Sequence, residues 1–121
     1  MSTFSCIVID DDYDVVESHT DSLKFYGVDV LGTGHNGKEA LELYQKVNPD
    51  IVFLDMNMPK YDGFYAIDEI KKIDPSAKII VVTASMNELM TEKIKSKNCP
   101  IINKPFNFNE LLDTAKKIID V

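Results

Sequence analysis

The chain has 121 residues, and its 13 lysines and arginines against 20 aspartates and glutamates give a formal net charge of −7. This length suits one compact domain, and the surplus of negative charge argues against nucleic-acid binding because a phosphate backbone would be repelled. No charged and apolar leader opens the chain and no apolar run approaches 18 residues, so we expect a soluble, cytoplasmic protein without membrane contact.

The first apolar run, "CIVID" at 6–10, predicts a strand, and it ends in three consecutive carboxylates, Asp10, Asp11 and Asp12. A helix near 14–26 is expected to follow. Asp12 and Asp14 fit the first turn of that helix, where the helix dipole favours acidic side chains. The other two acids need a different explanation, because like charges placed side by side raise one another's pKa.

The second run, at 28–33, alternates apolar and polar residues and carries Asp29, which favours a strand at the edge of a sheet. A helix near 37–47 is expected next. Asn36 is its expected N-cap, because asparagine side chains accept hydrogen bonds from the first free amides of a helix.

Within the third and fourth runs, at 50–55 and 78–84, the stretches 51–54 and 79–82 are apolar throughout. Strands that are buried on both faces of a sheet have this character. A helix near 63–73 is predicted between them. Another is predicted near 86–97, where Ser85-x-x-Glu88 fits a capping box.

The fifth strand is predicted at 100–103, and a helix over 107–120 closes the chain. Apolar residues recur along one face of this helix at the i, i+3, i+4, i+7 spacing: Phe108, Leu111, Leu112, Ala115, Ile118 and Ile119. The six phenylalanines are expected to pack mainly in or near the core. The two cysteines, Cys6 and Cys99, are expected to be small buried residues rather than a disulfide or a zinc site.

Five strands that alternate with five helices predict an α/β fold, with a parallel sheet and helices on both faces. In such sheets ligands bind beyond the carboxyl ends of the strands. Polar side chains follow four of the five runs there, and we expect them to converge on one rim: Asp10, Asp11, Asp55, Thr83 and Lys104.

Three carboxylates in one cleft must protonate, pair with a cation or hold a metal. A set of oxygen ligands without histidine or cysteine suits a hard cation, and Mg²⁺ binds through one or two carboxylates while leaving room for a phosphate oxygen. A carboxylate can also attack phosphorus and form an aspartyl-phosphate. Thr83 and Lys104 would then bind oxygens of the phosphoryl group, and the Lys104-Pro105 bond is of the kind that permits a cis peptide.

Five segments together resemble the receiver domain of two-component response regulators, of the CheY-like type. They are "IVIDDDYD", "NGKEAL", "PDIVFLDMNMPKYDG", "IIVVTA" and "INKPF". The resemblance covers the whole chain, so it implies one receiver domain over 1–121 with no output domain. It also implies the flavodoxin-like strand order 2-1-3-4-5.

The resemblance implies a role for each residue of the rim. Asp55 matches the phosphoacceptor, and Asp10 and Asp11 match the acidic pair that holds Mg²⁺. Asn57 matches the position whose backbone carbonyl also binds the metal. Thr83 and Lys104 match the hydroxyl and the lysine that bind the phosphoryl group.

The resemblance also implies partners. The donor would be the phosphohistidine of a histidine kinase or a phosphotransfer protein, or a small acyl phosphate. The chain would assist only its own phosphorylation and dephosphorylation, and so is not expected to be an enzyme. A downstream protein is expected to dock on the face formed by 86–97, the fifth strand and 107–120. Met86, Leu89 and Met90 on the fourth helix fit either the core or this partner surface, and the adaptability of methionine favours the surface.

Two positions depart from the family pattern. Ile101 stands where the family usually has tyrosine or phenylalanine, and Asn98-Cys99 replaces the usual Gly-Ala. An isoleucine cannot swing an aromatic ring between exposed and buried positions, so the conventional coupling to Thr83 is in question. An alternative interpretation is therefore an interaction module that has the fold without the phosphorylation.

A third interpretation is nucleotide binding at "GTGHNG", residues 32–37, which has the G-x-G-x-x-G spacing. Glu39 stands where a phosphate-binding loop needs serine or threonine, and the chain is too short for two mononucleotide-binding halves. Turn formation is the simpler explanation of these glycines. His19 and His35 are expected to be a helix-face residue and a loop residue rather than ligands.

Overall fold

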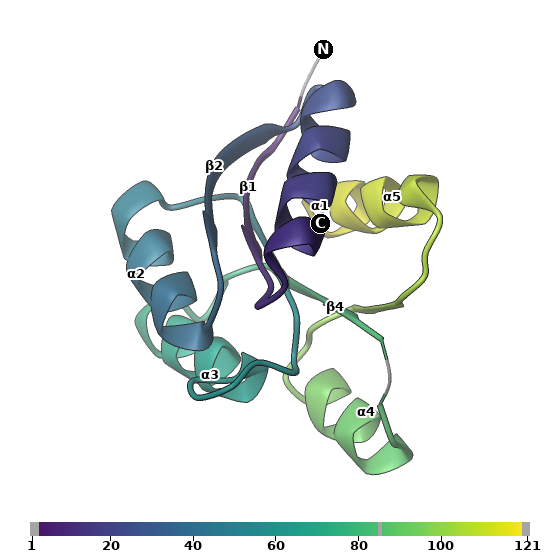
Figure 1. The fold of residues 1–121 in the computed structure, drawn as a ribbon. Coiled ribbons are helices and arrows are strands. Elements are labelled where there is room, and N and C mark those ends of the chain that lie inside the picture. The colour runs from purple at the N-terminus through teal and green to yellow at the C-terminus, as the bar shows by residue number, and fades with distance from the viewer. Residues whose placement is uncertain (1–2, 85, 120–121) are drawn as a thin grey trace.

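A computed structural model of the chain describes residues 3–84 and 86–119 (Figure 1). Strands and helices alternate along these residues in the order β1 (Ser5–Ile9), α1 (Tyr13–Phe25), β2 (Asp29–Gly34), α2 (Gly37–Val47), β3 (Ile51–Leu54), α3 (Gly63–Ile73), β4 (Ile79–Thr83), α4 (Glu88–Lys95), β5 (Ile101–Asn103) and α5 (Phe108–Ile119). The predicted alternation of five strands and five helices is confirmed.

The five strands form one parallel sheet in the order β2-β1-β3-β4-β5. This is the order that the family resemblance implies. β2 lies at an edge and alternates exposed and partly buried residues, whereas β3 and β4 are buried along their whole length. Burial on both faces of the sheet therefore explains why the central strands are apolar in sequence.

Helices cover both faces of the sheet, so the core has two halves. Figure 1 shows α1 and α5 on one side and α2 and α3 on the other. Val8, Phe53 and Val82 point toward α1 and α5, whereas Ile9, Leu54 and Val81 belong to the half that packs against α2, α3 and α4. Both cysteines are buried and unpaired, as expected.

Side chains cap the helices largely where the sequence places them. The Asp12 carboxylate accepts hydrogen bonds from the amides of Asp14 and Val15, and the Asn36 side chain accepts one from the amide of Glu39. The helix after β4 starts later than expected. Its N-cap is Asn87, whose side chain accepts from the Met90 amide, and the expected cap Ser85 lies outside the described residues.

The phenylalanines lie mainly in or near the core, as expected, with one exception. Phe25 is 83% exposed at the end of α1, because that residue lies on the solvent side of the helix, next to Tyr26. Phe4 and Phe53 are buried, and their rings pack together. Aromatic identity alone therefore does not tell which face of a helix end a side chain occupies.

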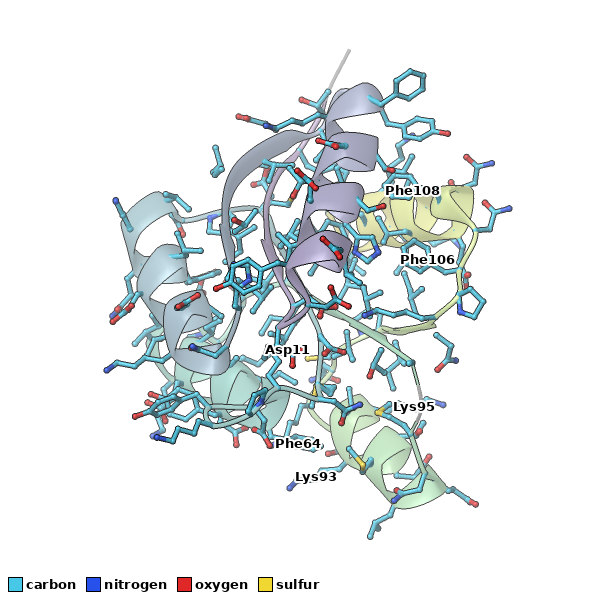
Figure 2. The ribbon with its side chains drawn as sticks, viewed as in Figure 1. Asp11, Phe64, Lys93, Lys95, Phe106 and Phe108 are labelled. Atoms are coloured by element: carbon cyan, nitrogen blue, oxygen red, sulfur yellow. The ribbon has the colours of Figure 1, made fainter. Side chains whose placement is uncertain are left out.

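Side chains from α3 and the segment after α4 hold α4 in place. The Lys93 ammonium lies 4.3 Å from the centroid of the Phe64 ring, and both residues are labelled in Figure 2. Lys97 forms an ion pair of 2.7 Å with Asp68. Across residues 3–84 and 86–119, no helix combines the length and the apolar character that crossing a bilayer requires.

Candidate functional site

Backbone hydrogen bonds between neighbouring strands bring the polar strand ends together. The N–H of Asp55 donates to the carbonyl of Ile9 at 2.9 Å, which places Asp55 beside Asp10. The N–H of Lys104 donates to the carbonyl of Thr83 at 2.8 Å. Because these bonds continue the parallel ladder, the side chains of adjacent strands emerge at the same rim.

The three predicted carboxylates converge. Asp10, Asp11 and Asp55 each place one carboxylate oxygen within 4.8 Å of the others. Asp10 and Asp55 are buried, whereas Asp11 is exposed at the mouth of the site, where Figure 2 labels it. A ligand that approaches from solvent therefore meets one exposed carboxylate and two buried ones.

Lys104 partly neutralises this cluster. Its Nζ donates a hydrogen bond of 2.6 Å to Oδ2 of Asp10 and lies 3.9 Å from Oδ1 of Asp55. The other Asp10 oxygen, Oδ1, accepts a hydrogen bond of 3.0 Å from the Asp12 amide. Both Asp10 oxygens are therefore engaged, and the ammonium lies between the two buried acids.

Burial and the neighbouring charges change the acidity of Asp55. Removal from water, followed by repulsion from Asp10, raises the pKa of Asp55 from 3.8 to about 6, although Lys104 acts in the opposite direction. The carboxylate is therefore more basic than an ordinary aspartate and is still mainly ionised at pH 7. These are the properties of a carboxylate that can act as a nucleophile.

Thr83 ends β4, the strand that pairs with β3 and β5, so it lies at the same end of the sheet as the acids. Its side chain is fully buried, and its Oγ1 has no hydrogen-bond partner within residues 3–84 and 86–119. A buried hydroxyl without a partner is unfavourable by about 1–3 kcal/mol. The end of β4 therefore holds a hydroxyl donor that is free to bond to an incoming oxygen.

The remaining predicted positions lie where the sequence places them. Asn57 is exposed in the loop after β3, two residues beyond Asp55. Ile101 is half-buried on β5 and packs against the core half formed with α2, α3 and α4. The Lys104-Pro105 bond is cis.

The glycine-rich segment does not form a phosphate cradle. Gly32 and Gly34 belong to the edge strand β2. The Gly37 amide donates to the carbonyl of Tyr61, and the His35 amide donates to the Glu39 carboxylate at 2.7 Å. Because these amides are already bonded, the segment offers little to a nucleotide phosphate.

Two histidines lie closer to the site than the sequence indicates. Nδ1 of His35 lies 3.1 Å from the carbonyl oxygen of Asp10, and the His35 ring packs against the Tyr13 ring at a tilt of 32°, with centroids 3.6 Å apart. His19 lines a small cavity beneath Asp10 and Asp55. No motif marks His19, so only the helical spacing of α1 could have placed it on this side.

The comparison with known protein families matches this geometry. A family model described as the response regulator receiver domain covers residues 6–116. The chain belongs to this family. Its strand order and its acidic rim are those of a CheY-like receiver domain of two-component signalling, whose members bind Mg²⁺ at an acidic cluster.

Individual relatives support this assignment. The receiver domain is 43% identical over 93 residues to the chemotaxis protein CheY of Thermotoga maritima. This alignment covers 76% of the present chain and 78% of that CheY. It is 34% identical over 95 residues to CheY of Bacillus subtilis, covering 78% and 79% of the two chains. A crystal structure of a complex of CheX, CheY, BeF3 and Mg²⁺ from Borrelia burgdorferi aligns with a TM-score of 0.87 at 28% identity, over 98% of this chain and 90% of that one.

Proposed function

We propose that this receiver domain accepts a phosphoryl group on Asp55 in an Mg²⁺-dependent reaction. The observation that carries the proposal is the convergence of three carboxylate oxygens within 4.8 Å, with the Lys104 ammonium 3.9 Å from Asp55. The phosphoryl group would come from the phosphohistidine of a kinase or phosphotransfer protein, or from a small acyl phosphate. The chain would promote only its own phosphorylation and dephosphorylation.

In the proposed step, an oxygen of the ionised Asp55 carboxylate attacks phosphorus and forms a new P–O bond. In the same step, the bond between phosphorus and the donor atom breaks. An acyl phosphate leaves as its carboxylate, whereas a phosphohistidine leaves as an imidazole whose nitrogen takes a proton from solvent. Lys104 can pair with one phosphoryl oxygen, and the unpartnered Thr83 hydroxyl can donate to another.

The acidic cluster suits Mg²⁺ by the chemistry of its donors. Carboxylates of Asp10, Asp11 and Asp55 are hard oxygen ligands, and the backbone carbonyl of Asn57 would be a fourth. When bound, the ion supplies positive charge that offsets the repulsion between the acids and an incoming phosphoryl group. The CheY structure from B. burgdorferi, which includes Mg²⁺ and BeF3, supports the same assignment here.

Phosphorylation would be read by a protein partner on the face formed by 86–97, β5 and α5. Leu89 is 79% exposed on α4, and Met86 packs partly against the core. Because Ile101 carries no ring, we propose that this face responds through movement of α4. Phosphorylation-dependent changes in amide chemical shifts along α4 would support this response, and their absence would contradict it.

Mass spectrometry after treatment with acetyl phosphate and Mg²⁺ tests the proposal. The wild-type chain should gain one acid-labile phosphoryl group, Asp55→Asn should gain none, and the exposed-residue control Asp113→Asn should behave as wild type. Omission of Mg²⁺ should prevent the gain. Equal modification of Asp55→Asn would contradict the assignment, and a wild type that neither binds Mg²⁺ nor is modified would favour the interaction module.

A further inference from the structure

His19 occupies an unusual position for an ionisable residue. It lies on α1, half-buried, with its ring centroid 5.2 Å from that of Phe106 at an interplanar angle of 68°. This edge-to-face geometry is favourable for aromatic pairs. Figure 2 shows Phe106 on the side of the sheet that α1 and α5 cover, so the contact connects α1 to the segment between β5 and α5.

The same histidine forms part of the floor of the acidic site. His19, Asp10 and Asp55 line one cavity of about 10 Å³, together with apolar residues such as Phe53 and Val82. A space of this size holds at most about one water molecule. The imidazole therefore lies close to the two buried acids, separated from them by little free space.

The contact with Phe106 lies close in sequence to the lysine of the site. Phe106 follows Lys104 by two residues, and Lys104 reaches back to Asp10 with a hydrogen bond of 2.6 Å. Burial and then the charge of Lys104 lower the pKa of His19, against an opposing effect of Asp10. The lowered pKa favours the neutral form of the ring, which adds no second positive charge near Lys104.

We propose that His19 is a positioning residue for Lys104. Its ring packs against the edge of Phe106 and fixes the turn from which the Lys104 side chain extends toward Asp10 and Asp55. An effect of His19 on the rate of phosphorylation rests on the proposed function of Asp55. The effect of His19 on the position of the Lys104 ammonium does not depend on that function.

A double-mutant cycle tests this role with acetyl phosphate as the donor. His19→Ala should slow phosphorylation by about two- to tenfold, the factor that corresponds to the usual energy of an aromatic pair. His19→Phe should restore the rate, since it keeps the edge contact. In a Lys104→Ala background, His19→Ala should have no further effect, because residues that act through one another are not additive.

Val16→Ala is the matched control, because Val16 is buried on the same helix and belongs to the same core half. It should lower stability without changing the rate. Multiplicative effects of His19→Ala and Lys104→Ala would overturn the proposal, and so would failure of His19→Phe to restore the rate.

A second measurement separates this proposal from the phosphorylation itself. The ammonium signal of Lys104 in nitrogen-15 NMR should be protected from solvent exchange in the wild type by its bond to Asp10. It should lose protection in His19→Ala and keep it in His19→Phe. If the wild type accepts no phosphoryl group, this signal still decides the positioning role, and unchanged protection in His19→Ala would overturn it.

Discussion

Replacing Asp55 with asparagine should stabilise the fold, and by more at neutral than at acidic pH. The pKa of Asp55 is raised from 3.8 to about 6 in the folded state, mainly by burial. The folded chain therefore holds this proton more tightly than the unfolded chain, so the stability of the wild type falls as pH rises through this range. Asparagine does not ionise, and its variant should not show the fall.

The magnitude follows from the two pKa values. Their difference corresponds to about 3 kcal/mol, fully developed above the folded-state pKa and absent below the unfolded one. Asp55 is only 6% exposed, so solvent screening reduces this value little. Between pH 4 and pH 8 the stability difference between Asp55→Asn and the wild type should grow by about 2–3 kcal/mol.

Urea unfolding followed by circular dichroism measures this difference, with a chelator present so that no divalent cation offsets the repulsion. Asp113→Asn, which alters an exposed aspartate on α5, provides the control. Added Mg²⁺ should stabilise the wild type and narrow the gap, because a ligand that binds only the folded state adds to its stability. A gap that does not change with pH, or an Asp55→Asn variant less stable than the wild type at pH 8, would refute the reasoning.

Three further outcomes are expected from other parts of the structure. Tyr44→Phe removes the hydroxyl that donates a 2.5 Å hydrogen bond to Asp74. The free energy of unfolding in urea should therefore fall by about 1–2 kcal/mol. An unchanged free energy would contradict this hydrogen bond. Gly37→Ala would place a Cβ 2.5 Å from the carbonyl oxygen of Tyr61. Thermal denaturation should therefore show that the free energy of unfolding falls by about 2 kcal/mol or more. An unchanged stability would be inconsistent with this close approach. Burial raises the pKa of the Cys6 thiol to about 12. Iodoacetamide at pH 8 should therefore label Cys6 only after the chain has unfolded. Rapid labelling of the folded chain would disprove the burial of this thiol.

Much of the site could be predicted from the sequence because strand ends are local features. Asp10 and Asp55 each follow an apolar run, and a parallel sheet brings the ends of neighbouring strands to one rim. Thr83 and Lys104 follow from the same rule. The spacing of apolar residues and the caps at Asp12 and Asn36 likewise concern neighbours within a few positions, so they gave most helix boundaries correctly.

Features that depend on contacts between distant segments could not be predicted. The position of His19 beneath the acids depends on how α1 packs against the segment before α5, and one histidine on a helix carries no sign of that packing. The exposure of Phe25 depends on where α1 ends relative to the sheet. The start of α4 was misplaced because asparagine at 87 can cap a helix as well as the serine two residues earlier.

The ion pair between Lys104 and Asp10 means that the site contains its own counter-ion. The ammonium already occupies one side of Asp10, so a divalent cation that approaches this carboxylate has to compete with a charge that the chain itself supplies. The ammonium thereby reduces the mutual repulsion of the acids. If the site binds Mg²⁺ as proposed, we expect this competition to make its occupancy follow the surrounding Mg²⁺ concentration.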